Sequence, residues 1–410
     1  MKKKTVREID AAGKRVLVRV DFNVPLRGTG QIEDDSRIRA CLPTIQLLAG
    51  QGARVLLCSH LGRPKGQVVE NLRLAPVADR LSNLLGMKVR ALRDCVGPEV
   101  EASVSAMRDG EIIILENLRF HPGEEADDPA FAASLARLAD IYVNDAFGAC
   151  HRRHASVVGI CQFLPAVAGL LLERELVMLG GLLENPKRPF AAIVGGAKVS
   201  GKLGVLENII TKVNMLFIGG GMAASFLAAK GFSVGDSPVE PERLKYVNGL
   251  LRKAEASRVR IFLPLDVLVA ENTHISSGSR TVAVSTIPNH TMIVDIGPET
   301  IALFVRELRA CRTAFWNGPM GVYEIPEFSI GTRTIAGSLA ELDAVTVVGG
   351  GSTAAIVTSL GFADRMSHVS TGGGASLQFL AGEVLPGIAA LGMREDPLLP
   401  AEEPKLGTPA

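Results

Sequence analysis

The chain has 410 residues, of which 47% are apolar and 21% are charged, and its formal net charge at pH 7 is +1. This length exceeds one typical hydrophobic core, so we expect two domains. The nearly balanced charge argues against general binding to nucleic acids or membrane surfaces, and no apolar run approaches the ~20 residues of a membrane span. The six cysteines match no zinc spacing and are expected to be free thiols in a reducing cytoplasm.

Short apolar strands alternate with helical patterns in the first half of the chain. We expect helices over 37–50 and 74–86, and strands at 15–20, 53–59, 88–92, 111–117 and 141–145. Strands rich in valine, isoleucine and leucine that are joined by helices form parallel sheets with both faces buried. The first half is therefore predicted to be a doubly wound α/β domain.

A long amphipathic stretch near 165–190 is predicted to be a connecting helix followed by a hinge at "NPKRP". The second half then repeats the pattern of the first. Its helices include 242–257 and 299–311, and its strands are expected at 190–196, 215–220, 260–264, 292–297, 313–318 and 344–350. The predicted fold class is therefore α/β, with two doubly wound, Rossmann-like domains of parallel sheet. The tail from Asp396 is expected to be a surface extension.

Basic and polar side chains follow the strands of the first half. They are Asp21, Asn23, Arg37, His60, Arg63, Arg119 and Arg152. The carboxyl ends of parallel strands meet at one edge of the sheet, where ligands bind. Clustered arginines repel one another unless an anion lies among them, so this edge is predicted to bind a small anion. Scattered surface salt bridges are the alternative. A zinc site at "HRRH" (151–154) is disfavoured, because its two arginines would repel a dication.

Four glycine-rich turns follow strands of the second half, at 195–202, 218–222, 348–353 and 370–374. Three lead directly into helical patterns, where amide groups and the helix dipole favour phosphate; simple tight turns are the alternative. The first turn is not a Walker P-loop, because Leu203 stands where serine or threonine is required. Lys198 and Lys202, one helical turn apart, are expected to face the same phosphate chain. Glu324, after another strand, is either a ribose ligand or a surface acid.

The residue types favour phosphoryl transfer between two bound substrates. No Ser/His/Asp set, activated cysteine or close carboxylate pair emerges from the sequence. Direct phosphoryl transfer needs no covalent nucleophile, since positioning and charge neutralisation supply most of the catalysis.

These motifs together resemble the phosphoglycerate kinase family over roughly residues 5–390. The segments that carry the resemblance, in the family's order and spacing, are "VRVDFNVP", "SHLGRP", "ENLRFHPGEE", "YVNDAFGACHRRH", "GGAKVSGK", "WNGPMGVYE" and "HVSTGGGASL". The resemblance implies a cytoplasmic, monomeric enzyme of glycolysis and gluconeogenesis that reversibly transfers a phosphoryl group from 1,3-bisphosphoglycerate to ADP, giving 3-phosphoglycerate and ATP. It also implies Mg²⁺ with the nucleotide and closure about a hinge.

The resemblance assigns roles residue by residue. The phosphoglycerate would be held by Asp21, Asn23, Arg37, His60, Arg63, Arg119 and Arg152. The nucleotide would be held by Lys198, Lys202, Gly219, Glu324, Gly349, Gly350, Gly351, Ser352 and Thr353. The migrating phosphoryl group would be steadied by Arg37, Lys198, Gly351 and Gly374. The hinge positions would be Glu175, Ser370 and Thr371.

The resemblance also implies the domain limits. A phosphoglycerate domain would span 1–168 plus about 379–410, a connecting helix 169–186, and a nucleotide domain 187–378. The first domain would therefore be discontinuous.

One departure from the family pattern concerns the metal. Ser352 stands where an aspartate that binds the nucleotide's magnesium is usual, and a neutral hydroxyl is a poorer ligand for a hard dication. Gly201 and Glu383 are lesser departures. The alternatives are a weakly active nucleotide-binding homologue with a regulatory role, which rests on Ser352 alone, and an unrelated sugar-acid kinase.

Overall fold

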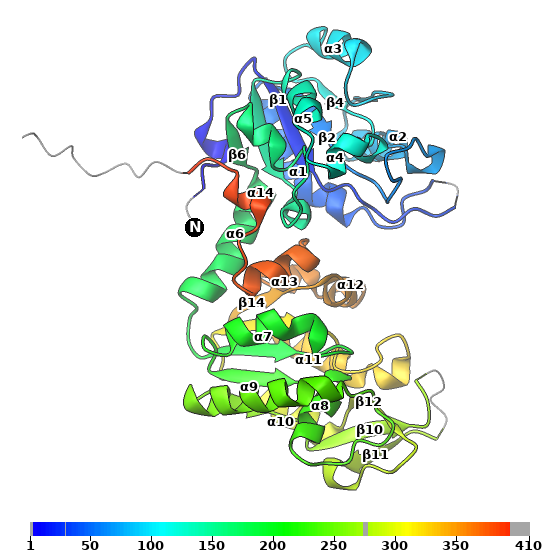
Figure 1. Ribbon diagram of the computed structural model, residues 1–410, viewed down its shortest axis with the longest axis vertical. Coiled ribbons are helices and arrows are strands. Elements are labelled where there is room, and N and C mark those ends of the chain that lie inside the picture. Colours follow the sequence, from blue (N-terminus) through cyan, green and yellow to red (C-terminus); the bar gives the residue numbers. More distant parts are fainter. Residues whose placement is uncertain (1–2, 29, 274–277, 394–410) are drawn as a thin grey trace, which may run out of the picture.

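The computed structural model describes residues 3–28, 30–273 and 278–393. It consists of two lobes joined by the long helix α6 (Leu170–Glu184) (Figure 1). The expected tail from Asp396 lies outside the described residues. Within the part of the chain that is described, no helix combines the length and the apolar character needed to cross a bilayer.

The first lobe is built on a six-stranded parallel sheet in the order β3-β4-β2-β1-β5-β6. Its strands are β1 (Arg15–Val20), β2 (Arg54–Cys58), β3 (Val89–Ala91), β4 (Ile112–Ile114), β5 (Ile141–Asp145) and β6 (Ala166–Ala168). Its helices are α1 (Ser36–Gly50), α2 (Ala75–Leu85), α3 (Pro98–Ser105), α4 (Pro122–Glu125) and α5 (Pro129–Ala136).

The central strand β1 is buried on both faces, as its apolar sequence predicts. Val16 and Val18 pack in the cluster that contains the buried residues of α1 and α2. Leu17, on the opposite face, packs in the cluster that contains those of α3 and α5. The sheet is therefore a middle layer between two layers of helices.

The second lobe repeats this plan with the strand order β15-β14-β13-β7-β8-β9, again parallel. Its strands are β7 (Phe190–Val194), β8 (Met215–Ile218), β9 (Arg260–Phe262), β13 (Thr313–Asn317), β14 (Val345–Val348) and β15 (His368–Val369). Its helices are α7 (Leu203–Ile209), α8 (Met222–Ala229), α9 (Leu244–Ala256), α10 (Pro298–Leu308), α11 (Ile330–Ala340), α12 (Gly351–Ser359) and α13 (Gly374–Leu380). The predicted fold class, two doubly wound parallel sheets, is confirmed.

One predicted strand belongs to a different sheet. The segment expected at 292–297 forms β12 (Met292–Ile296), but it pairs antiparallel with β10 (Asp266–Ala270), which also pairs antiparallel with β11 (Arg280–Ala283). The expectation that it belongs to the parallel sheet is therefore wrong. The physical reason lies just after β9. Pro264 cannot donate a hydrogen bond to a neighbouring strand, so the parallel strand stops before it. A separate strand, β10, begins at Asp266 and is the one that pairs with β12.

The segment around α14 (Pro386–Ala389) lies against the first lobe, beside α6 (Figure 1). The Gly387 amide donates to the carbonyl oxygen of Cys150 at 2.9 Å, and the Gly392 amide donates to that of Ala166 at 3.0 Å. Lys3 Nζ donates to the Leu391 carbonyl oxygen at 2.8 Å. Both ends of the described chain are thus bonded to the same lobe.

Candidate active site

The first polar cluster lies past the carboxyl end of β1. Arg37, in the first turn of α1, makes a 2.5 Å ion pair from Nη1 to Oδ2 of Asp21, a residue that is almost fully buried. The Asp21 carboxylate stands close to the Gly148 backbone, where a Cβ would lie only 2.7 Å from Oδ2. The glycine therefore leaves room for the carboxylate and the arginine that it orients.

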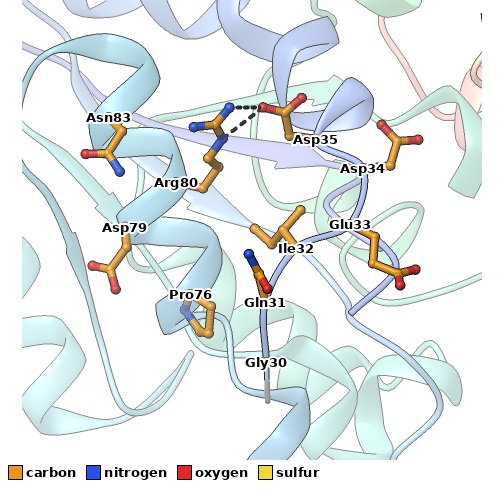
Figure 2. A pocket seen from close by; sticks show the side chains of 10 residues that line it. All are labelled: Gly30, Gln31, Ile32, Glu33, Asp34, Asp35, Pro76, Asp79, Arg80 and Asn83. Carbon is orange, nitrogen blue, oxygen red and sulfur yellow. Dashed lines mark hydrogen bonds and ion pairs between the residues drawn. The ribbon is translucent and has the colours of Figure 1, made fainter. Parts of the chain in front are cut away.

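The start of α1 is braced from the neighbouring helix α2. Asp35 accepts hydrogen bonds from Arg39 Nε at 2.8 Å and from Arg80 Nη2 at 2.6 Å, and Figure 2 shows Arg80 reaching across from α2. The open hollow beside this pair is also lined by the exposed acids Glu33, Asp34 and Asp79. Carboxylates repel phosphate, so this hollow is not the anion site.

His60 follows β2 and is buried, with 4% of its surface exposed. Its Nδ1 lies 3.1 Å from Nη2 of Arg19, which is itself buried and bonded to Ser156 Oγ at 2.9 Å. A guanidinium only donates, so Nδ1 accepts and the ring proton is assigned to Nε2. Burial, followed by the charges of Arg19 and Arg119, holds the pKa of His60 well below its usual value. His60 is therefore a neutral donor.

Arg119 and Arg152 are cations with incomplete hydrogen bonding. Arg119 Nη1 donates to the Gly62 carbonyl oxygen at 2.8 Å, and its Nε lies 3.0 Å from Glu125 Oε1. Burial lowers the pKa of both guanidinium groups. Among the described residues, Arg152 Nη1 and His151 Nδ1 are buried and have no hydrogen-bond partner, whereas Arg119 Nε makes the ion-pair contact with Glu125 without a well-formed hydrogen bond. Buried donors without acceptors are costly, so this edge is arranged for an acceptor group.

The two remaining polar residues of this edge differ in their surroundings. Asn23 Oδ1 accepts from the Gly62 amide at 2.9 Å, which joins the loops after β1 and β2. Arg63 is exposed, although its charge still contributes to the lowered pKa of Arg152. The fold thus brings all seven predicted residues to one edge of the sheet, with Arg63 at its margin.

In the second lobe, the turns after β7, β8 and β13 are bonded to one another. The Gly196 amide donates to the Pro319 carbonyl oxygen and the Gly220 amide to that of Met320, both at 2.9 Å. A Cβ at Gly219 would lie 2.5 Å from the sulfur of Met320, so only glycine permits this approach. Glu324 is exposed in the loop that follows.

The two lysines of the first glycine turn lie in different environments. Lys198 is exposed in the loop before the short 3-10 turn Ser200–Lys202, so the pair does not share one regular helix as expected. Lys202 is half-buried, and its Nζ donates to the Asn317 carbonyl oxygen at 2.8 Å. Burial lowers the pKa of Lys202 to about 7.

The turn after β14 presents backbone amides at the start of α12. Gly350 has a φ of +89°, and a Cβ there would collide with the side-chain amide of Asn317. At Gly351 a Cβ would meet nothing within 4 Å, so this side of the turn is open. Ser352 is exposed, whereas Thr353 is buried and its Oγ1 accepts from the Gly318 amide at 2.7 Å. Its hydroxyl therefore joins two turns of the site.

The last glycine turn connects the two lobes. A Cβ at Gly372 would collide with the Phe147 ring of the first lobe, and α13 begins at Gly374. Glu175 of α6 accepts from the Thr371 amide at 2.7 Å and lies 2.8 Å from His368 Nε2. The Ser370 hydroxyl accepts from the Gly372 amide at 3.1 Å. The predicted hinge positions thus lie together.

Asn317 is a polar residue of this region that the sequence analysis did not single out. Its Nδ2 donates to the Gly349 carbonyl oxygen at 2.6 Å, and its buried Oδ1 has no partner in the described part of the chain. Asn317 lies at the carboxyl end of β13, immediately before Gly318 and Pro319. This position at a strand end, where ligands bind, could have marked it as a candidate site residue.

Comparisons with known proteins agree with this arrangement. A family model described as "Phosphoglycerate kinase" matches residues 6–383. The chain belongs to the phosphoglycerate kinase family. A phosphoglycerate kinase of Pelotomaculum thermopropionicum is 56% identical over 391 residues, which cover 95% of this chain and 99% of that relative. One of Synechococcus elongatus is 54% identical over 398 residues, with the same coverage.

A solved phosphoglycerate kinase from Coxiella burnetii superimposes with a TM-score of 0.87 at 40% identity, and covers 95% of this chain and 98% of that structure. The predicted activity, a phosphotransferase with a carboxyl acceptor, is therefore confirmed at the level of the phosphoglycerate kinase family. The alternative of a weakly active regulatory homologue is not favoured.

Proposed function

We propose that the polar edge of the first lobe binds 3-phosphoglycerate or 1,3-bisphosphoglycerate, through Asp21, Asn23, Arg37, His60, Arg63, Arg119 and Arg152. One observation carries this proposal: buried nitrogens of Arg152 and His151 have no hydrogen-bond partner among the described residues, and Arg119 Nε has only its ion-pair contact with Glu125. A carboxylate or phosphate would supply those acceptors and would offset the repulsion between Arg119 and Arg152.

The second lobe, in this proposal, binds ADP or ATP. The amides of Gly349, Gly350, Gly351 and the hydroxyl of Ser352 would meet the phosphates, together with Lys198 and Lys202. Gly219 would contribute through its backbone, which its lack of a Cβ lets pack against Met320, and Glu324 would accept from the ribose hydroxyls. The open backbone at Gly351, at the start of α12, supports this placement because helix N-termini favour anions. Thr353 acts by fixing the turn at Gly318.

The reaction is a direct displacement at phosphorus. A terminal oxygen of ADP forms a bond to the phosphorus of the acyl phosphate while the bond to the carboxyl oxygen breaks, and the carboxylate of 3-phosphoglycerate leaves. Arg37, Lys198 and the amides of Gly351 and Gly374 would stabilise the charge on the migrating group. Such groups act in the transition state, where the charge is spread over the equatorial oxygens.

Magnesium is proposed to travel with the nucleotide. Ser352 presents an exposed neutral hydroxyl at the start of α12. The buried Asn317 Oδ1 lacks a partner among the described residues and would be available as a hydrogen-bond acceptor beside the turn at Gly349. These groups fit a metal that is held chiefly by phosphate oxygens and water. When bound, Mg²⁺ would neutralise phosphate charge.

Arg37 belongs to the first lobe and Lys198 to the second, so the proposed reaction requires the lobes to close about Glu175, Ser370 and Thr371. We propose domain limits of 1–168 plus about 379–410, 169–186 and 187–378. The bonds from Gly387 and Gly392 to the first lobe support the discontinuous domain. We also propose a cytoplasmic monomer without nucleic-acid or membrane partners.

A coupled assay with ATP and 3-phosphoglycerate over a series of Mg²⁺ concentrations tests this function. We expect saturable turnover that depends on both substrates and on magnesium. Turnover with another sugar acid in place of 3-phosphoglycerate, but not with 3-phosphoglycerate itself, would contradict the proposal.

A further inference from the structure

A cluster of three potential metal ligands lies outside the proposed reaction site. Asp94 and Cys95 lie in the loop between β3 and α3, and His121 precedes α4. One side-chain donor atom from each residue, an oxygen, a sulfur and a nitrogen, lies within 4.8 Å of the other two. None of these residues has a role in the phosphoryl transfer described above.

The three donors suit a particular class of cation. Thiolate and imidazole favour zinc and similar borderline-soft ions, whereas magnesium favours oxygen ligands only. A thiolate, a carboxylate and a neutral imidazole would also balance the two positive charges of the ion. We propose that Asp94, Cys95 and His121 form a zinc-binding site, with water as the fourth ligand.

The cluster is already held in place by its surroundings. The His121 ring stacks on Phe131 at 5.2 Å between centroids, with 25° between the planes, and its Nε2 lies 2.7 Å from Asp94 Oδ1. The Asp94 carbonyl oxygen accepts from the Glu116 amide at 3.3 Å. Little ordering of the chain is therefore needed before an ion binds.

Two of the three proposed ligands can be reached from solvent. Cys95 is fully buried, whereas 53% of the Asp94 side chain and 31% of the His121 side chain are exposed. The ion would enter between the two exposed ligands and reach the sulfur beneath them. Arg93, the exposed neighbour of Asp94, would weaken but not block this approach.

Binding requires two proton movements. Burial and the neighbouring Asp94 raise the pKa of the Cys95 thiol, so its S–H bond breaks only when the sulfur–zinc bond forms, and the proton passes to solvent. His121 Nε2 now donates a hydrogen bond to Asp94, so Nε2 would give its proton to solvent and Nδ1 would take one up. The ring would stay neutral, and Nε2 would coordinate the ion. Zinc would thereby join the loop after β3 to the turn that precedes α4 and would stabilise the first lobe.

Calorimetric titration of the full chain with ZnCl₂ tests the proposal. We expect one ion per chain, and affinity lower by at least about ten-fold in each of D94N, C95S and H121Q, since losing a ligand costs no less than losing a supporting residue. H290Q is the matched control. His290 Nδ1 also lies near a carboxylate, 3.6 Å from Asp236 Oδ2, but this pair includes no cysteine. C161S controls for loss of a thiol. Neither control should change the affinity.

Cobalt(II) provides a second readout that does not depend on stability. We expect a thiolate-to-cobalt charge-transfer band with the unmodified chain, lost in C95S and retained in C161S. Excess Mg²⁺ should not displace the ion. The proposal is overturned if the unmodified chain binds no zinc, if D94N, C95S and H121Q bind it as tightly as the controls, or if the cobalt band survives in C95S.

Discussion

Arg37 has two roles in the proposed mechanism: it would bind the phosphoglycerate, and it would stabilise the migrating phosphoryl group. Its ion pair with the buried Asp21 holds its guanidinium beyond the end of β1. We expect Arg37→Ala to lower kcat by about 10²-fold or more, because one preorganised charge-stabilising donor has that effect. Steady-state kinetics with both substrates measures it.

The matched control for Arg37 is Arg27→Ala. Arg27 is 71% exposed and pairs with the exposed Glu33, so its removal should leave kcat unchanged. A normal kcat with only a raised KM in Arg37→Ala would contradict a role in the transition state.

Lys202 predicts a pH dependence of nucleotide binding. Its pKa of about 7 means that the free lysine loses its charge as the pH rises through neutrality, whereas bound phosphates would restore the charge. We expect ADP to bind more weakly as the pH rises from about 6 to about 9, with uptake of a fraction of a proton. Calorimetry in buffers of different ionisation enthalpy measures both.

Lys202→Arg is the comparison for this prediction, because arginine stays charged throughout that range. The variant should bind ADP without the proton uptake seen in the unmodified chain. Equal proton uptake by the two proteins at about pH 8 would show that another group is responsible.

Ser352 is the position at which this chain departs from the family pattern. A carboxylate is a better ligand for a hard dication than a hydroxyl. We expect Ser352→Asp to lower the magnesium concentration that gives half the maximal rate, with Ser352→Asn changing it less because the amide is neutral. An unchanged magnesium requirement in Ser352→Asp would remove this interpretation.

At the residue scale, the sequence was most informative where a residue's position in a motif determines its role. His60 could be placed because it follows a recognisable strand, and Arg37 because it opens the first predicted helix. The contact of buried Arg19 with His60 could not be predicted, because Arg19 is also bonded to Ser156, which is far away in the chain. Asn317 was missed because an asparagine beside a Gly-Pro pair reads as part of a turn.

Among the elements, α6 depends on a buried carboxylate at its first turn. Asp145 Oδ1 accepts from the amides of Leu171 and Leu172 at 2.9 and 3.2 Å, and Gly169 leaves room for it. Burial raises the pKa of Asp145 to about 6. The helix that joins the lobes therefore begins on a carboxyl group that holds its proton more tightly than a carboxyl group in water does.

The raised pKa of Asp145 makes the free energy of unfolding fall as the pH rises. The folded state holds the proton more tightly than the unfolded state, so the favourable contribution is complete below about pH 4 and is lost as the pH rises through about 6. The change in the free energy of unfolding is on the order of 2–3 kcal/mol. Denaturant unfolding over this pH range measures it.

Asp145→Asn should remove this pH dependence, because its amide oxygen can still accept from the helix while no group titrates. The other carboxyl groups contribute equally to both proteins. The difference between the free energies of unfolding of the unmodified chain and the variant therefore reports on Asp145 alone. If the free energies of unfolding of the two proteins stay parallel between about pH 4 and pH 6, the assignment to Asp145 is wrong.

The strands that the sequence predicted correctly are those buried on both faces, such as β1 and β5. The small antiparallel sheet was harder to predict. The strand β11 is largely exposed and has no continuous apolar run, while β10 follows closely after β9, and only one strand, at 260–264, was expected in this part of the chain. The two-residue strand β15 is too short to carry a periodic signal. The strand β6 was missed because its residues lie in the apolar stretch near 165–190 that was expected to be the connecting helix, which begins only at Leu170.

At the scale of the whole molecule, the account depends on the two lobes supplying different halves of one site. The contact of the turn at Gly372 with Phe147, and the bonds from Glu175 to Thr371, already join the last glycine turn to the first lobe and to α6. Closure about these residues would bring Arg37 toward the phosphates bound at Gly351. The sequence predicts two lobes and a ligand for each, and the ligands remain a prediction. The contacts at Gly372 and Glu175 join residues too distant in the chain for spacing to show them.

A crystal structure of the enzyme with 3-phosphoglycerate and a non-hydrolysable ATP analogue bound together tests this central claim most directly. The account predicts 3-phosphoglycerate on the first-lobe residues Arg37, His60, Arg119 and Arg152. It predicts the nucleotide phosphates on the turn at 349–353 and a smaller separation of the lobes than without ligands. Both ligands in one lobe, or 3-phosphoglycerate bound away from those four residues, would contradict it.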